Sequence, residues 1–193
     1  MILSKIILHS FALVFFIIIS VKAQPTEEWA GNINMQQSFI VKYDELGNQL
    51  WTRLIPDIPV VYSSNSNIVV DENNNIYISG QNISKIVTKK FNAEGKSVWS
   101  SDFRLGSFSL SASSLEIDDS SNIYVCQNIG GFFEQGILLL KYDSTGTIKW
   151  EAKCRGFDGD YLCNLNVDKY KNVYLVSTAY GFNNDFVTVK YDK

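Results

Sequence analysis

The sequence predicts an all-β protein built from repeated four-stranded antiparallel units, and three observations support this prediction. One set of residues recurs three times along the 193-residue chain, and a second set recurs three times at another fixed spacing. No sustained period of 3.6 residues, which an amphipathic helix would require, follows Ala23. Self-similarity at a period of about 50 residues is typical of an array of supersecondary units.

The first recurring set combines an aromatic residue, a glycine and a tryptophan. Its members are Tyr43, Gly47 and Trp51; Phe91, Gly95 and Trp99; and Tyr142, Gly146 and Trp150. The aromatic residue precedes the tryptophan by eight residues each time, and the tryptophans are 48 and 51 residues apart. An Asp or Asn after the aromatic residue opens a turn, and the glycine supplies the positive φ that closes it. Each set therefore predicts one β-hairpin.

The second recurring set consists of an aspartate and a tyrosine six residues apart. Its members are Asp71 and Tyr77, Asp118 and Tyr124, and Asp168 and Tyr174. An asparagine lies four residues after each aspartate, and the residues that follow alternate β-branched side chains with aromatic or small ones, as a strand should. This set predicts a second hairpin. The intervals between the two kinds of hairpin vary, which indicates a repeated scaffold with changeable connections.

Four strands in about 48 residues is the size of one propeller blade. We therefore predict a β-propeller-type repeat of four-stranded antiparallel blades, with units at about 39–85, 86–136 and 137–186 and the start of a fourth at 187–193. Apolar runs such as Ile137 to Leu140 place bulk on both faces of a strand, as a sheet between two neighbours requires. Parallel β-helices have shorter coils and lack such paired tight turns.

The first 23 residues have the features of a secretory signal peptide. Lys5 precedes an apolar run that begins at Ile6, and Ala23 provides a small residue at the expected cleavage point. A membrane anchor is the alternative, but the run of 16 residues is shorter than the roughly 20 that a span needs. We expect 24–193 to be a soluble partial propeller that is exported to the periplasm, the cell surface or the extracellular space.

The number of strands predicts an incomplete ring. Trp29 precedes Tyr43 by 14 residues, as Tyr77 precedes Phe91, so it marks one strand before three complete blades, and one further strand follows them. The total of 14 strands is about half of a ring, since closed propellers have roughly four to eight blades. Truncation of a larger protein is the favoured explanation; assembly of several chains through open blade faces and a stand-alone arc are the others.

Composition excludes several kinds of chemistry. The only histidine, His9, lies in the predicted leader, so the remaining chain has no imidazole for a Ser-His-Asp group or a zinc site. The formal charge of −3 becomes −5 without the leader, which argues against nucleic acid and anionic lipid as partners. The segment from Asp71 to Asn75 resembles the start of a calcium loop, but a plain polar turn fits it better. We expect no catalytic residue, metal site or cofactor.

The three cysteines leave their redox state open. Cys154 and Cys163 are nine residues apart, and in an exported protein they are candidates for a disulfide across a loop. The odd count leaves Cys126 over, and its place within a predicted strand favours a structural thiol.

Aromatic residues outside the repeated sets are the candidates for partner binding, because they lie in the variable segments where binding sites concentrate. They are Phe103, Phe108, Phe132, Phe133, Tyr180 and Phe182. The alternative is that these side chains pack back onto the sheets. The recurring tryptophans are interpreted as packing residues between blades, although a stacking platform for sugars is the competing interpretation.

The repeated segments resemble the SBBP family of bacterial β-propeller repeats. The residues that carry the resemblance are Asp185 to Asp192, Asp143 to Trp150, and Val167-Asp168 followed by Asn172-Val173-Tyr174. The family usually has glycine before the asparagine of the second turn, where this chain has Asn74, Ser121 and Lys171. The resemblance implies an exported scaffold and supplies no catalytic residues.

Two functions follow from these expectations. The first is a non-catalytic exported propeller module that presents loops to a protein or glycan partner. The alternative is a fragment of a propeller-type enzyme, either a quinone-dependent dehydrogenase, whose repeat the segment from Gly146 to Trp150 resembles weakly, or a lyase. A ring of loops around a central site is needed for such catalysis, and the partial array does not provide it.

Overall fold

The structure is a computed structural model, and it describes residues 15–21, 37–55, 67–82, 85–104, 109–130, 135–155, 164–179 and 185–192. These residues belong to two compact units, Met1–Val60 and Val61–Lys193. Both units are built from antiparallel β-sheets, and the described residues contain no helix. The prediction of an all-β protein with four-stranded antiparallel sheets is confirmed. Consequently, no helix suitable for crossing a membrane occurs within the described ranges.

The first unit contains one three-stranded sheet in the order β1-β2-β3. Its strands are β1 (Phe15–Val21), β2 (Gln37–Tyr43) and β3 (Gln49–Ile55). β1 lies within the predicted leader and pairs with β2 along all seven residues, from Phe15 opposite Tyr43 to Val21 opposite Gln37. The strand expected around Trp29 lies outside the described residues.

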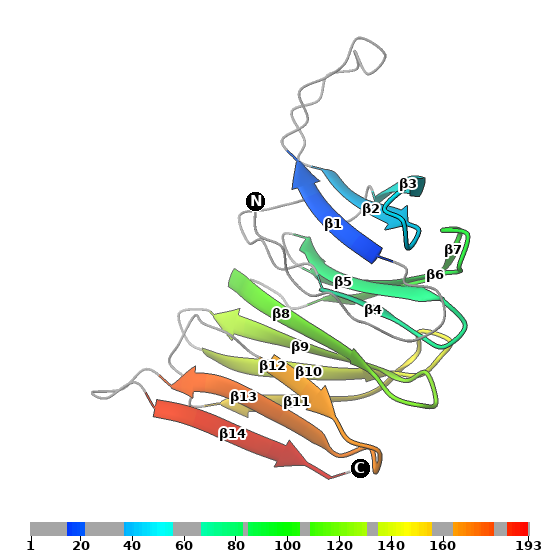
Figure 1. Ribbon diagram of the computed structural model, residues 1–193. Coiled ribbons are helices and arrows are strands. Elements are labelled where there is room, and N and C mark those ends of the chain that lie inside the picture. The colour runs from blue at the N-terminus through cyan, green and yellow to red at the C-terminus, as the bar shows by residue number, and fades with distance from the viewer. Residues whose placement is uncertain are drawn as a thin grey trace. The chain divides into compact units, whose positions relative to one another are not determined.

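The second unit contains three sheets, which Figure 1 shows from green to red. The first comprises β4 (Asn67–Val70), β5 (Ile76–Asn82), β6 (Lys85–Phe91) and β7 (Ser97–Arg104). The second comprises β8 (Ser109–Ile117), β9 (Ile123–Gly130), β10 (Gln135–Tyr142) and β11 (Ile148–Arg155). The third comprises β12 (Asn164–Val167), β13 (Val173–Ala179) and β14 (Asp185–Tyr191). Neighbouring strands in each sheet are also neighbours in the chain.

Both kinds of predicted hairpin are present. The aspartate–tyrosine intervals form the turns β4–β5, β8–β9 and β12–β13, and the aromatic–tryptophan intervals form the turns β2–β3, β6–β7 and β10–β11. Each turn between an aromatic residue and a tryptophan has a register shift just before its Asp or Asn, as between Lys90 and Phe91. The glycine that follows, such as Gly95 with φ 75°, takes the left-handed conformation that this bulged hairpin needs.

The predicted sequence units and the observed sheets differ in phase by two strands. A predicted unit such as 86–136 runs from β6 to β9, whereas the sheets run from β4 to β7 and from β8 to β11. The physical reason is that strand pairing continues across the short connection between Asn82 and Lys85, which joins the two hairpins into one sheet. Pairing within the first sheet ends at β7, and β8, which begins at Ser109, is the first strand of the next sheet.

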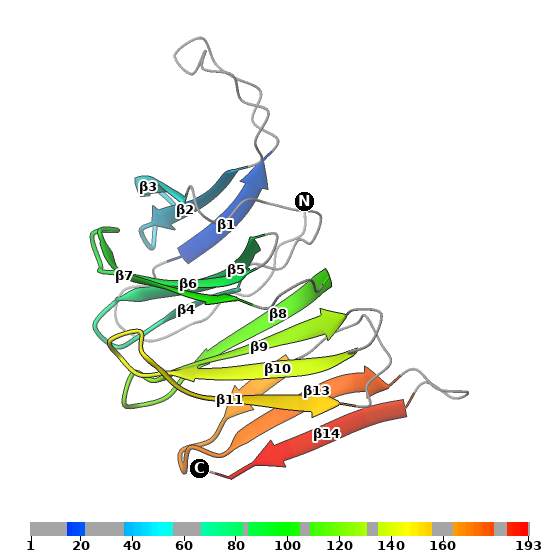
Figure 2. The same cartoon turned by 180° about the vertical axis from the view of Figure 1, so that it is seen from behind.

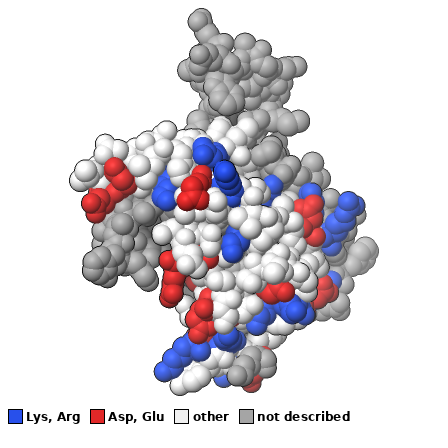
Figure 3. Space-filling view, turned by 90° about the vertical axis from the view of Figure 1, so that its right-hand side faces the viewer, with Lys and Arg blue, Asp and Glu red and all other residues white. Residues whose placement is uncertain are grey.

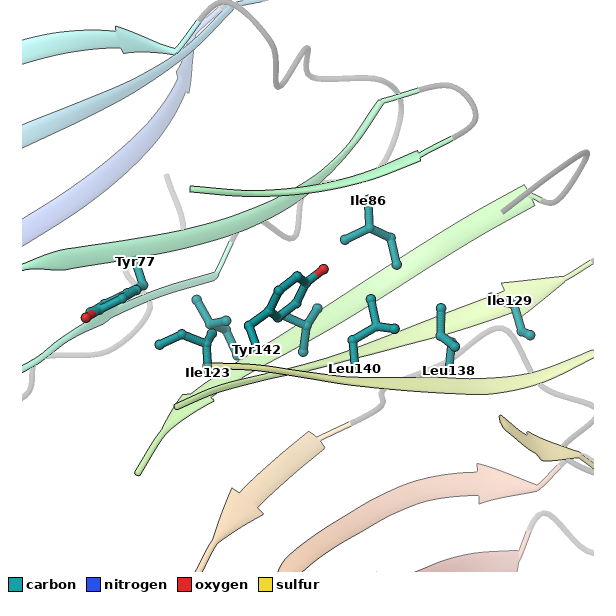
Figure 4. Close-up of a cluster of buried hydrophobic side chains, with 9 residues drawn as sticks. Tyr77, Ile86, Ile123, Ile129, Leu138, Leu140 and Tyr142 are labelled. Carbon is teal, nitrogen blue, oxygen red and sulfur yellow. The ribbon is translucent and has the colours of Figure 1, made fainter. Parts of the chain in front are cut away.

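The first two sheets of the second unit bury a shared apolar core. Ile123, Val125 and Ile129 of β9 project from one face of the second sheet, because alternate residues of a strand point the same way. They pack with residues of the first sheet, including Tyr77 and Ile86, as Figure 4 shows. Leu138, Leu140 and Tyr142 complete this core from β10, and all three are fully buried.

The opposite face of the second sheet packs against the third sheet. Tyr124 and Cys126 of β9 join Leu165, Val173 and Leu175 in a second buried cluster. β4, β8 and β12 are the first strands of their sheets, and β8 lies beside both β4 and β12. Figure 2 shows the same layered order from behind. The three sheets of this unit therefore form an open stack with their first strands adjacent.

Candidate functional site

The sheets of the second unit have two chemically different ends. Antiparallel strands place both tight turns of a four-stranded sheet at one end, here called the turn end, which lies to the right in Figure 1. The connections of variable length leave from the opposite end, here called the loop end. β7 ends there at Arg104, β9 at Gly130, β11 at Arg155 and β13 at Ala179.

The aspartate turns at the turn end are saturated with hydrogen bonds. Asp118 Oδ1 accepts the backbone N–H groups of Ser120 and Asn122, each at 2.9 Å. Asp118 Oδ2 accepts the Asn122 side-chain amide at 2.8 Å and the Tyr124 hydroxyl at 3.2 Å. Asp71 and Asp168 accept the same four donors, with tyrosine hydroxyl distances of 3.0 and 3.1 Å. This network explains the fixed interval of six residues between aspartate and tyrosine.

These hydrogen bonds favour the ionised form of Asp118 and Asp168. Burial alone raises the pKa of Asp118, but the hydrogen bonds from Asn122, Ser120 and Tyr124 outweigh it and lower the pKa below its ordinary value. The pKa of Asp168 is lowered by the same balance. A general acid needs a carboxyl group whose pKa is raised toward the working pH. Asp118 and Asp168 are therefore structural residues that are unsuited to acid catalysis.

The turns between an aromatic residue and a tryptophan form similar local hydrogen bonds, but without a tyrosine hydroxyl. Asp143 Oδ1 accepts the backbone N–H groups of Thr145 and Thr147 at 3.0 Å and the Thr145 hydroxyl at 2.6 Å. The hydroxyl bond is the main reason why the pKa of Asp143 is lowered. Asp44 and Asn92 bind the equivalent backbone groups. All of these turns are thus closed units that leave the carboxylate or amide oxygen engaged.

The remaining repeated residues form a row across each sheet, here called the cross-sheet row. Lys90 lies directly opposite Tyr77 on one side and Trp99 on the other. Lys90 Nζ lies 5.0 Å from the centroid of the Tyr77 ring, and the Tyr77 and Trp99 ring centroids are 6.1 Å apart. The second sheet repeats the row with Tyr124, Lys141 and Trp150. The third sheet has Tyr174 and Lys190.

The cross-sheet row of the first sheet packs against the second sheet. Trp99 stacks on Tyr142 with 6.4 Å between ring centroids, and Trp99 Nε1 donates to the Ser144 carbonyl at 3.1 Å. The Trp99 ring also covers Gly146, where a Cβ atom would lie only 2.7 Å from Trp99 Cδ2. The interpretation of Trp99 as a packing residue between sheets is therefore supported by its contacts.

Buried polar groups without partners lie near the loop end. Asn128 and Ser177 are 4% and 3% exposed, and Asn128 Nδ2 and Ser177 Oγ have no hydrogen-bond partner. Alternation along β9 and β13 places both on the faces that form the second cluster. Each lies two residues from the loop end of its strand. Unsatisfied buried polar groups are rare in native proteins, and Tyr142 Oη, at the turn end of β10, is another buried atom without a partner. Such atoms therefore occur toward both ends of the sheets.

The structure locates one of the six predicted binding aromatics. Phe103 of β7 is half-buried and packs against the first cluster, so the alternative interpretation of packing onto the sheets applies to it. The other five, Phe108, Phe132, Phe133, Tyr180 and Phe182, lie outside the described residues. The strand ends that flank them are at the loop end. Asn128 and Ser177 were not predicted, because a single polar residue within a strand has no repeated spacing.

The cysteine predictions are wrong for the residues that the structure describes. Cys154 carries a free thiol, so it does not form the predicted pair with Cys163, which itself lies outside the described residues. Cys126, expected as a structural thiol, is disulfide-bonded. Both side chains belong to the face of the second sheet that contacts the third. Sequence separation alone does not determine which sulfur atoms meet, because pairing depends on the geometry of packed sheets.

No group of ligands suitable for a metal ion occurs within the described ranges. The turn at Asp71, which resembles the start of a calcium loop in sequence, is the polar turn that the sequence favoured. Its four oxygen contacts are all made by donors of the chain itself.

Comparison with known proteins provides a fold relationship and no family. No family model matches the chain, and no curated protein matches it. Among solved structures, an α-L-arabinofuranosidase from Clostridium thermocellum is similar with a TM-score of 0.55 and 12% identity, over 97% of this chain and 67% of the enzyme chain. At this identity the likeness concerns the fold alone, and it supports a propeller-like all-β architecture for this chain.

Proposed function

We propose that the chain is an exported, non-catalytic module of propeller type that binds a protein or glycan partner at its loop end. The observation that carries this proposal is the contrast between the two ends of the sheets. The turn end repeats one closed hydrogen-bond network, whereas the connections that differ in length from sheet to sheet leave from the loop end. Partner recognition concentrates in variable connections on a rigid scaffold.

Two further features support parts of this proposal. The disulfide bond of Cys126 is in accord with an oxidising compartment and thus with export. The face in Figure 3, which is the right-hand side of Figure 1, shows basic and acidic groups interspersed, without the single-sign field that a nucleic acid would require. The resemblance to SBBP repeats remains part of the proposal.

The test is partner binding by variants at the two ends. Phe132→Ala and Phe133→Ala change the connection that follows β9, and Tyr170→Ala is the matched control because Tyr170 is an aromatic side chain of the turn end that is 63% exposed. Binding to a panel of glycans, with arabinose-containing polymers first, should be lost in the former and retained in the latter. Equal binding by all three variants would contradict a loop-end site.

A glycoside hydrolase is the second candidate, and the structural likeness to an arabinofuranosidase favours it. Such enzymes use a pair of carboxyl groups on either side of the scissile bond, one of them with a raised pKa. The repeated aspartates do not meet this requirement, since those whose pKa values shift have lowered ones. Release of 4-nitrophenol from 4-nitrophenyl α-L-arabinofuranoside above the protein-free rate would support the hydrolase, and its absence would support the binding module.

A further inference from the structure

The disulfide-bonded sulfur of Cys126 lies deep between two packed sheets. Cys126 is in the middle of β9, and it is 0% exposed. It belongs to the buried cluster that the second and third sheets share, together with Leu165 of β12. A cysteine of a second molecule cannot reach a sulfur atom that is covered in this way. The partner of Cys126 must therefore come from the same chain.

The number of cysteines leaves one partner within the chain. The sequence has three cysteines, and Cys154 carries a free thiol. The remaining one, Cys163, lies outside the described residues. It precedes Leu165 by two residues in the sequence, so the described position of Leu165 limits how far Cys163 can be from Cys126.

The start of β12 is held beside Cys126. The backbone N–H group of Leu165 donates to Ser114 Oγ at 3.2 Å. Ser114 lies directly opposite Cys126 in the pairing of β8 with β9, where Cα atoms are about 4.5–5.5 Å apart. Two residues of chain span at most about 7 Å. A residue two positions before Leu165 can therefore reach the Cα separation of about 4.4–6.8 Å that a disulfide requires.

We propose that Cys126 and Cys163 form a disulfide bond that joins β9 to the chain entering β12. Its formation removes two protons and two electrons from the two thiols, and a small-molecule or protein disulfide accepts them and is released as two thiols. The bond closes a loop that contains β10 and β11, and it links the second sheet to the third in addition to their apolar packing. This link is independent of partner binding.

Peptide mapping of the oxidised chain identifies the pair directly. Trypsin should place the three cysteines in separate peptides, 105–141, 154–155 and 156–169. The full chain is refolded with glutathione disulfide, so the test does not depend on export. It is then unfolded in urea that already contains iodoacetamide, which blocks the thiol of Cys154 before it can exchange with the disulfide.

We expect 105–141 to be joined to 156–169, with a mass two hydrogens below the sum of the two peptides, and the alkyl group to be on Cys154 alone. A bond between 105–141 and 154–155, a bond between two chains, or alkylation of all three cysteines would overturn the proposal.

Thermal unfolding tests whether the bond links the sheets. All variants carry Cys154→Ser, which prevents a new pairing and should itself melt close to the wild type. Adding Cys163→Ala should lower the melting temperature by roughly 5–15 °C. Adding Cys126→Ala as well should give little further loss beyond that of Cys126→Ala alone, since either change removes the same bond. Equal melting temperatures with and without Cys163→Ala would contradict the proposed link.

Discussion

At the scale of single residues, the two turn glycines Gly47 and Gly146 separate backbone strain from packing. Both have left-handed backbones, with φ of 84° and 85°. A Cβ atom at Gly47 would meet nothing within 4 Å, whereas one at Gly146 would collide with the Trp99 ring. Alanine at Gly47 therefore introduces backbone strain alone, whereas alanine at Gly146 introduces both backbone strain and a steric clash.

We expect Gly47→Ala to lower the free energy of unfolding by about 1–2 kcal/mol, the cost of a left-handed alanine. Gly146→Ala should lower it by about 1–3 kcal/mol more, because the Trp99 ring must move. Urea denaturation of both variants measures the difference. In the background of Trp99→Leu the extra cost of Gly146→Ala should shrink, and an undiminished cost would contradict the contact.

The second residue-scale prediction concerns Ser121, which has φ 58° in the turn between β8 and β9. Non-glycine residues pay about 1–2 kcal/mol for this conformation. Ser121→Gly and Ser121→Ala both remove the hydroxyl, which interacts with the phenol of Tyr77, but only the glycine variant relieves the backbone. Thermal unfolding should show Ser121→Gly to be more stable than Ser121→Ala by about 1 kcal/mol, and the reverse order would disprove the strain.

The sequence shows that the aspartate turns have residues other than glycine at this position, but it does not show the backbone conformation of those residues. Asn74, Ser121 and Lys171 occupy equivalent positions in the three aspartate turns, and all three have positive φ. The turn keeps its shape without glycine because four hydrogen bonds to the aspartate hold it. A sequence pattern identifies such a position, and only the backbone angles show that the conformation was kept at the expense of strain.

At the scale of the element, the aspartate turn makes the second unit sensitive to acid. The pKa of Asp118 is lower in the folded chain than its ordinary value of 3.8, so the unfolded chain binds the proton more tightly. By linkage, the stabilisation is fully present above that ordinary value and is lost as the pH falls through the folded pKa. Other turns with lowered pKa values, such as that of Asp168, add to the same trend.

Asp118→Asn should reduce this acid sensitivity and lower stability at neutral pH by on the order of 2 kcal/mol, because an amide replaces a carboxylate that accepts four hydrogen bonds. Urea denaturation between pH 7 and pH 3 should give a shallower decline for the variant than for the wild type. Glu72→Gln, an exposed position in the turn of Asp71, is the control and should follow the wild type. If the free energy of unfolding declined in parallel for the wild type and both variants, Asp118 would not be the cause of the acid sensitivity.

The hairpins were predictable because their information is local. Each turn is determined by residues within a fixed interval, such as Asp118 to Tyr124, and by hydrogen bonds that do not depend on the rest of the chain. The assignment of hairpins to sheets was not predictable, since pairing between β5 and β6 depends on contacts across Asn82 and Lys85. The predictions for the cysteines were wrong for the same reason, because the way in which the sheets stack determines which sulfur atoms meet.

At the scale of the whole molecule, the second unit behaves as a stack of similar layers. Each layer contributes its own turns, and each interface adds a cluster of buried side chains, so stability should be close to a sum over layers and their neighbours. The cross-sheet row contributes to both the sheet and the stack. Lys90 and Trp99 are paired within one sheet, and the Trp99 ring packs against Gly146 in a turn of the next sheet. A residue of the repeated set thus takes part in the packing of one sheet against the next.

The contact between Trp99 and Gly146 tests this account most directly, because it joins two sheets through residues 47 positions apart in the chain. Nuclear magnetic resonance of the isotope-labelled chain should show a nuclear Overhauser effect between the Trp99 ring and the Gly146 α-protons. The ring current should also shift those protons strongly upfield, and Trp99→Leu should abolish the shift. Ordinary chemical shifts for Gly146, with no such effect in a folded chain, would contradict the stacking of these sheets.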